Sequence, residues 1–250
     1  MHERALPLGV TIMPLGSAPA SFDVVARLGV VGVQLDASDA SLRPRELGVS
    51  AQRDVQASLR RRGLCASGID CFIPMERLTD PSQVEHCLEV VRGCLVLAEC
   101  LDRVPVCMCL PEQGADEIVA AILHEAARRG VPLADFSSWR AGADSRQAGI
   151  DPAAVLAKKS DPSKAVMEAA GHLAAARIVD LFTNGMRGPI GDPDGARLDA
   201  LSYRVALDVA GFQGLPVIDC REWSHAASQV PLCIARWNAL LPTRAGDQAA

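Results

Sequence analysis

The feature that most constrains the fold is a regular alternation of short apolar runs with segments of helical periodicity. Apolar runs of strand length recur eight times, and each is followed by a helix or a helix-like segment. Alternating units of this kind predict a parallel sheet covered by helices. The predicted strands are 6–13, 30–36, 64–74, 104–110, 131–137, 147–151, 177–182 and 215–220.

Helix boundaries carry recognisable signals. Ser50 is a suitable N-cap, Gly63 and Gly130 are stop signals, and Asp80-Pro81 places a cap before a proline in the first turn. In the helix that follows Pro81, apolar residues recur every three or four positions, which indicates one buried face. The predicted helices are 21–29, 50–63, a long one from 81 onward, 115–130, 162–176, 198–211 and 228–241.

Eight strand–helix units in 250 residues match the usual size of a (β/α)8 barrel. We therefore predict an α/β fold, a TIM barrel forming one domain over residues 1–250. A doubly wound open sheet is the alternative, but LGVTIMPLGSAPA lacks the Gly-rich dinucleotide fingerprint after its strand. The stretch 138–160 is the only candidate linker, and it is too short to separate two self-sufficient halves.

Composition excludes several classes of protein. Aromatic residues make up only 4% of the chain, so an aliphatic core is expected, and a net charge of −5 without a basic face argues against a nucleic-acid partner. The first ten residues lack a signal-peptide core, and no run of about 18 uncharged apolar residues suggests a membrane span. Nine scattered cysteines without a CxxC pair indicate buried thiols in a reducing compartment, hence a cytoplasmic protein. A homo-oligomer is compatible with this sequence.

Acidic residues stand on or near the ends of seven of the eight predicted strands. In a TIM barrel, the carboxyl ends of the strands and the loops after them form the catalytic face, here called the mouth. The sequence thus predicts a ring of carboxylates around the mouth. Its members are Asp36, Asp70, Glu112, Asp135, Asp151, Asp180 and Asp219.

Clustered carboxylates repel one another, and a divalent cation or a charged substrate would relieve that repulsion. A set of oxygen ligands suits a hard ion such as Mg²⁺ or Mn²⁺. The competing interpretation is that individual acids cap helices or brace loops, as Asp151 before Pro152 would do.

The segment 177–219 resembles the closing third of the xylose isomerase-like TIM barrels, the sugar phosphate isomerase/epimerase superfamily. The resemblance lies in a strand, RIVDLF, a Gly-rich loop containing Arg187, a helix, and GFQGLPVID; GVVGVQL also looks like that family's second strand. It implies a small polyhydroxy carbonyl substrate and a divalent metal, Mn²⁺ or Mg²⁺. The family's metal ligands match Asp135, Asp151, Asp180 and Asp219.

The same resemblance implies catalytic roles. Asp135 and Asp219 match the acid/base pair that moves a proton beside the carbonyl group, and Arg187 matches a residue that holds substrate oxygens. Asp36, Asp70, Glu112 and His225 are the further residues assigned to substrate binding at the mouth, His225 because it follows the last predicted strand.

The sequence departs from the family at these positions. Aspartate replaces both glutamates, shortening each side chain by about 1.5 Å, and aspartate also replaces the histidine ligand. Two hypotheses stay open: a divergent sugar isomerase or epimerase using metal-assisted proton transfer, and a catalytically degenerate barrel kept as a ligand-binding or partner-binding scaffold. An endonuclease of the same fold would need a His-rich zinc site and a basic face, and the chain shows neither.

Overall fold

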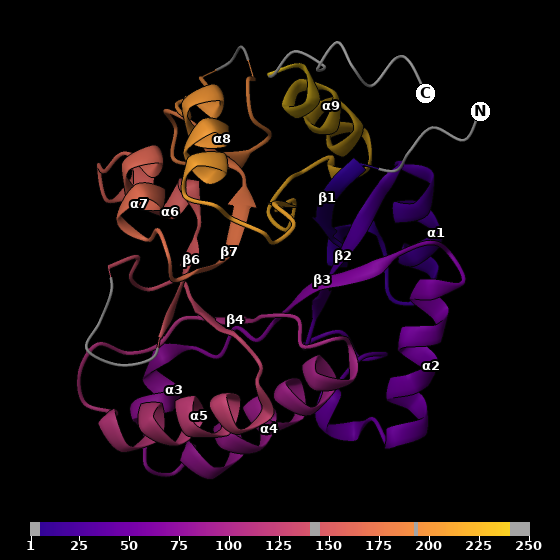
Figure 1. Cartoon of the computed structure of the whole chain (residues 1–250), viewed down its shortest axis with the longest axis vertical. Coiled ribbons are helices and arrows are strands. Elements are labelled where there is room, and N and C mark those ends of the chain that lie inside the picture. The colour runs from indigo at the N-terminus through magenta and orange to yellow at the C-terminus, as the bar shows by residue number, and fades with distance from the viewer. Residues whose placement is uncertain (1–5, 141–145, 193–194, 241–250) are drawn as a thin grey trace.

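Eight parallel strands form a closed ring in the computed structural model, which describes residues 6–140, 146–192 and 195–240 (Figure 1). The first strand pairs with the second on one side and with the last on the other, and this closes the TIM barrel that the sequence predicts. Around the ring the order is β1-β10-β7-β6-β5-β4-β3-β2. The strands are β1 (Leu6–Thr11), β2 (Val30–Asp36), β3 (Cys65–Asp70), β4 (Val106–Met108), β5 (Leu133–Asp135), β6 (Gln147–Ile150), β7 (Leu173–Ile178) and β10 (Val217–Ile218).

Helices surround this ring. Figure 1 shows α1 and α2 beside β2 and β3, α3, α4 and α5 along one side of the molecule, and α6, α7 and α8 beside β6 and β7. The helices are α1 (Ala20–Arg27), α2 (Val49–Arg60), α3 (Met75–Thr79), α4 (Val84–Cys100), α5 (Asp116–Arg129), α6 (Pro152–Ala157), α7 (Pro162–Glu168), α8 (Ala200–Val209) and α9 (Ala226–Ala239), with two 3-10 turns, Met13–Leu15 and Pro44–Glu46.

The core is aliphatic, as the low aromatic content predicts. On α4, the periodic positions Cys87, Val91, Cys94 and Leu95 are all buried against the barrel. The helix starts at Val84, three residues after Pro81, and Gln83 is its N-cap residue. The Asp80 carboxylate accepts hydrogen bonds from the backbone N–H and the hydroxyl of Ser82 in the turn before it. All nine cysteines are free thiols.

The seventh barrel strand begins earlier than the sequence predicts. The helix expected over 162–176 ends at Glu168, and residues 173–178 form β7. Gly171, three residues after the helix, adopts a φ of 86°, a conformation that glycine allows in the turn between α7 and β7. The strand predicted over 177–182 is divided: its first residues end β7, and Asp180–Leu181 form a separate short strand, β8. β8 pairs antiparallel with β9 (Arg187–Gly188), which lies in the predicted Gly-rich loop.

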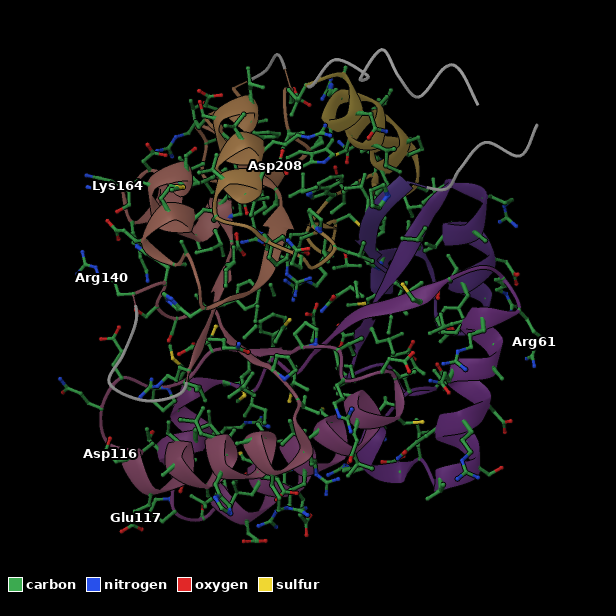
Figure 2. The ribbon with its side chains drawn as sticks, in the orientation of Figure 1. Arg61, Asp116, Glu117, Arg140, Lys164 and Asp208 are labelled. Atoms are coloured by element: carbon green, nitrogen blue, oxygen red, sulfur yellow. The ribbon has the colours of Figure 1, made fainter. Side chains whose placement is uncertain are left out.

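Charged side chains cover the outside of the molecule. Figure 2 labels six of them: Arg61, Asp116, Glu117, Arg140 and Lys164, which project at the edge of the molecule in this view, and Asp208, an exposed residue of α8. Among the described residues, no helix is both long enough and apolar enough to cross a membrane.

Candidate functional site at the barrel mouth

The acidic residues lie at the carboxyl ends of the barrel strands, as predicted. Asp36, Asp70 and Asp135 are the last residues of β2, β3 and β5. Asp151 and Asp219 directly follow β6 and β10. Because the strands are parallel, their carboxyl ends all meet at the same end of the barrel.

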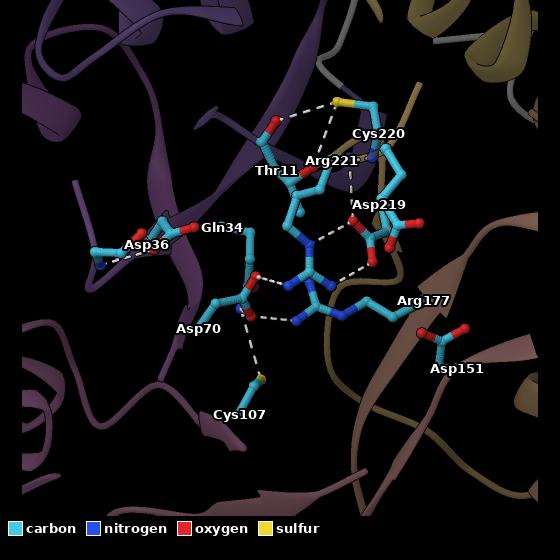
Figure 3. Close-up of polar contacts among 12 residues, drawn as sticks. Thr11, Gln34, Asp36, Asp70, Cys107, Asp151, Arg177, Asp219, Cys220 and Arg221 are labelled. Atoms are coloured by element: carbon cyan, nitrogen blue, oxygen red, sulfur yellow. Dashed lines mark hydrogen bonds and ion pairs between the residues drawn. The ribbon is translucent and has the colours of Figure 1, made fainter. Parts of the chain in front are cut away.

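An arginine reaches into the barrel from β7 and pairs with one of these acids. Arg177 is only 1% exposed, and its Nη2 donates to Asp70 Oδ1. The same oxygen accepts from Gln34 Nε2 at 2.7 Å (Figure 3). The Arg177 guanidinium also lies over the Phe136 ring, 5.1 Å from its centroid. A buried charge requires such partners, since an unpaired ion in the interior is strongly destabilising.

A second arginine binds Asp219 in a bidentate arrangement. Arg221 Nε donates to Asp219 Oδ1 at 2.7 Å, and Nη2 donates to Oδ2 at 2.5 Å. Arg221 Nη1 lies 3.5 Å from Asp70 Oδ2, and the guanidinium stacks on Phe72 at 4.3 Å. Figure 3 shows the guanidinium groups of Arg177 and Arg221 lying between the carboxylates of Asp70 and Asp219.

A third arginine links the end of β6 to the end of β10. Arg187, on β9, donates through Nη2 to Asp151 Oδ2 at 2.8 Å and to Asp219 Oδ2 at 3.0 Å. Its Nε lies 3.5 Å from Glu222 Oε1, a carboxylate that is 67% exposed at the rim. Asp151 also caps α6, because Oδ1 accepts from the Ala154 backbone N–H. Both predicted roles of Asp151, in the mouth and as a cap, are therefore combined in one side chain.

The surrounding arginines keep the carboxyl group of Asp219 ionised by lowering its pKa. Burial would raise the pKa of this carboxyl, but the hydrogen bond from Arg221 and the charges of Arg177, Arg221 and Arg187 outweigh it and hold the pKa well below its usual range. Asp70 behaves differently, because burial raises its pKa against the charges of Arg177 and Arg221. Asp219 is thus an ionised, fully hydrogen-bonded carboxylate and a weak base.

A cavity of about 320 Å³ opens beside this network. Its wall combines aromatic rings, a thiol and both signs of charge, which suits a small polar ligand with a carbon skeleton. The lining residues are Phe72, Cys109, Phe136, Asp151, Ala154, Arg187, Arg221 and Glu222.

Asp135 and Asp180 are largely engaged by the backbone around them. Asp135 Oδ1 accepts from the backbone N–H groups of Leu110 and Ser137, while Oδ2 lies 3.7 Å from Arg146 Nη1. Asp180 Oδ1 accepts from three backbone N–H groups, those of Leu181, Arg197 and Leu198. Burial raises the pKa of Asp180 despite these bonds. Neither residue lines the cavity.

The remaining predicted residues lie outside the cavity wall. Asp36 accepts from the backbone N–H and hydroxyl of Ser38 and braces the loop after β2. Glu112 is exposed in the loop after β4. His225 is exposed at the N-cap of α9, where its carbonyl accepts from Ser228 and Gln229. Of the predicted site residues, the cavity brings together only Asp151 and Arg187, with Asp219 behind them.

The donor set does not fit a divalent ion. Within residues 6–140, 146–192 and 195–240, no three His, Cys, Asp or Glu side chains gather closely enough to hold a metal. Both carboxylate oxygens of Asp219 and Oδ2 of Asp151 instead accept hydrogen bonds from arginine guanidinium groups. The metal ligation by Asp135, Asp151, Asp180 and Asp219 stays a prediction that the geometry does not favour.

Sequence reasoning missed Arg177 and Arg221. A signal for each was present: Arg177 is the charged residue that opens the apolar run RIVDLF, and Arg221 follows Asp219 within two residues. A charge in a strand that enters a barrel must find a countercharge there, and the acidic strand ends supply it.

Comparison with known proteins supports the fold at low sequence identity. No protein-family model and no curated protein matches the sequence. Among solved structures, a xylose isomerase domain protein from Planctomyces limnophilus is 18% identical, with a TM-score of 0.70 over 94% of this chain and 96% of that one. A D-psicose 3-epimerase from Clostridium cellulolyticum H10, solved with D-tagatose, is 13% identical, with a TM-score of 0.72 over 95% and 100%.

A third similar structure is that of the IOLI protein with a zinc atom bound. It is 11% identical, with a TM-score of 0.72 over 94% of this chain and 96% of that one. At these identities the likeness shows the fold alone, which is that of the xylose isomerase-like TIM barrels.

Proposed function

We propose that this xylose isomerase-like barrel binds a small polyhydroxy carbonyl compound, of the size of a keto-sugar, in the cavity at its mouth. One observation carries the proposal: the cavity is lined both by charged groups, those of Arg187, Arg221 and Asp151, and by the aromatic rings of Phe72 and Phe136. Guanidinium and carboxylate groups make charge-assisted hydrogen bonds to hydroxyl and carbonyl oxygens, and aromatic rings cover the carbon skeleton.

The geometry favours binding without metal-assisted turnover. In the enzymatic hypothesis, Asp135 and Asp219 would exchange a proton with the substrate. A general base must lie within hydrogen-bond reach of the proton it removes and needs a pKa near the working pH. Asp219 meets neither requirement well, since Arg221 and Arg187 occupy its oxygens and its pKa is lowered. A ligand-binding barrel is therefore the better-supported of the two hypotheses.

Titration with ketohexoses tests the proposal. D-tagatose and D-allulose are suitable first ligands, because structures similar to this one contain them. We expect saturable binding by calorimetry or saturation-transfer NMR, and at least a tenfold loss of affinity in Arg187→Met. Arg60→Met is the matched control, since Arg60 is an exposed residue of α2 that pairs with Asp102.

Two results would count against this function. Affinity that Arg187→Met leaves unchanged would place the ligand elsewhere, and failure to bind any sugar, sugar acid or sugar phosphate would remove the proposal. Conversion of a ketohexose to its epimer or aldose isomer, dependent on added Mn²⁺ and lost in Asp219→Asn, would favour the metal-assisted isomerase instead.

A further inference from the structure

The guanidinium groups of Arg187 and Arg221 lie against Asp151 and Asp219, two of the residues that the family resemblance assigns as metal ligands. Asp151 and Asp219, which follow two strands of the barrel, both accept a hydrogen bond from the same atom, Arg187 Nη2. Bridging two carboxylates through one positive centre is the arrangement that a bound divalent ion would otherwise make. Here the bridge is a guanidinium from the chain itself.

The remaining oxygen of Asp219 is also occupied by a guanidinium. Arg221 donates to Oδ1 through Nε and shares Oδ2 with Arg187. A metal ion could use Asp219 only if Arg221 were displaced, yet Arg221 is held by the Phe72 ring and by its approach to Asp70. Displacement would thus break several contacts at once.

The charges of the network are balanced. Arg177, Arg187 and Arg221 face Asp70, Asp151 and Asp219, and the exposed Glu222 lies at the rim. The Asp219 side chain is 1% exposed, and the Arg187 and Arg221 side chains are 17% and 21% exposed. Repulsion among the buried carboxylates is therefore already relieved by groups of the chain, which removes the electrostatic demand for a divalent ion.

We propose that Arg187 and Arg221 are the resident cations of the mouth and take the place of a divalent metal on Asp151 and Asp219. The inference concerns the cation and not the ligand, so it does not depend on which compound the cavity binds. Removing both arginines should leave Asp151 and Asp219 as a free pair of carboxylates, to which a divalent ion could bind with water as its other ligands.

The test uses Mn²⁺ as the probe and the paramagnetic resonance signal of free Mn²⁺ as the readout, so no activity is needed. EDTA-stripped wild type, Arg187→Met/Arg221→Met and the control Arg60→Met are titrated. We expect the double variant to bind Mn²⁺ at least tenfold more tightly than wild type, and we expect Asp219→Asn, added to it, to abolish the gain. Arg187→Lys should not bind Mn²⁺, because it keeps the positive charge.

Two outcomes would overturn the inference. One is wild-type protein that binds Mn²⁺ at micromolar concentration and loses that binding in Asp219→Asn, since the arginines would then yield to the metal. The other is a folded double variant that binds Mn²⁺ no better than wild type. If the double variant does not fold, Mn²⁺ binding is measured on Arg187→Met alone, and wild type is compared with Asp219→Asn.

Failure of this inference and failure of the proposed function are distinguishable. Sugar titrations are made without added metal, and Mn²⁺ titrations are made without sugar. A chain that binds Mn²⁺ in its native form and also binds a ketohexose would refute the resident cations alone.

Discussion

Arg177 is among the largest fully buried side chains, and its charge sits inside the barrel. Only Nη2 has a hydrogen-bonded acceptor in the described structure, Asp70, while Nε and Nη1 have none. Burial alone would lower the pKa of Arg177, but the nearby charges, that of Asp70 above all, raise it by more, so the residue stays charged. The buried pair is then a place where one substitution has a large effect.

At the residue scale, we predict strong coupling between Arg177 and Asp70. Arg177→Met or Asp70→Asn alone leaves a buried charge without its main partner and should cost roughly 3–5 kcal/mol. The double variant removes both charges and should be less destabilised than the sum of the two by more than about 1 kcal/mol. Urea unfolding at pH 7 measures all three. Single effects that add within about 0.5 kcal/mol would contradict the coupling.

The helices at the solvent-exposed surface of this chain end where the local sequence signals predict. The segments that complete the barrel sheet depart from those signals. On α5, Gly130 in a left-handed conformation ends the helix as predicted. In the Ala-rich run before residue 177, helix propensity predicts more helix, but residues 173–178 form a buried strand. Propensities differ by well under 1 kcal/mol per residue, so completing the sheet outweighs them.

The outer face of α5 makes a prediction about pH. Arg128 and Arg129 hydrogen-bond to Glu125, and these contacts lower the pKa of Glu125 to about 2. A carboxyl with a lowered pKa stabilises the fold above its unfolded value and loses that contribution as pH falls toward the folded value. Glu125→Gln should therefore cost about 0.5–1 kcal/mol at pH 7 and less near pH 3, where part of this contribution is already lost.

Urea unfolding of Glu125→Gln at both pH values measures this change. Glu112→Gln is the control, because Glu112 is exposed in the loop before the same helix and should leave stability almost unchanged. An equal cost of Glu125→Gln at pH 7 and pH 3 would show that the ion pairs are not its source.

At the scale of the whole molecule, closure of the barrel requires close approach between neighbouring strands. Gly9 of β1 faces Gly32 of β2 in the parallel register. A Cβ on Gly32 would lie 2.8 Å from the Gly9 Cα, 3.0 Å from the Leu8 carbonyl oxygen and 2.7 Å from a Leu215 methyl group. Two of these neighbours are backbone atoms of the barrel and cannot move without shifting the strand.

Gly32→Ala should accordingly destabilise the protein by about 1–3 kcal/mol through overpacking. Gly48→Ala is the matched control: a Cβ on Gly48 would meet nothing within 4 Å beyond its chain neighbours, and the φ of −67° suits alanine. In Gly48→Ala, alanine is a poorer N-cap than glycine, which destabilises the protein, but it also makes the unfolded chain less flexible, which stabilises it. We expect these two effects on the free energy of unfolding to cancel within about 0.5 kcal/mol. Thermal and urea unfolding of the two variants measure the difference, and equal effects would contradict this account of closure.

The sequence alone determined the barrel and the end of it at which the acids stand. Both follow from local sequence patterns. The alternation of apolar runs with amphipathic helices predicts the barrel, and the acids at the ends of those runs predict which end of the barrel is acidic. The approximate places of most strands and long helices were likewise predictable. The exceptions are the end of α7 and start of β7, the hairpin of β8 and β9, and the short helices α3 and α6, which no predicted helix covers.

The groups that balance the charges of the acids become known only from the three-dimensional arrangement. Arg177, Arg187 and Arg221 come from β7, from β9 and from the loop after β10, yet they meet Asp70, Asp151 and Asp219 from β3, β6 and β10 within hydrogen-bond or ion-pair distance. A charge in an apolar run must have a partner, but the sequence does not say which residue that partner is. Ion pairing depends on separations of a few ångströms. Between residues far apart in the chain, those separations are set only when the barrel closes.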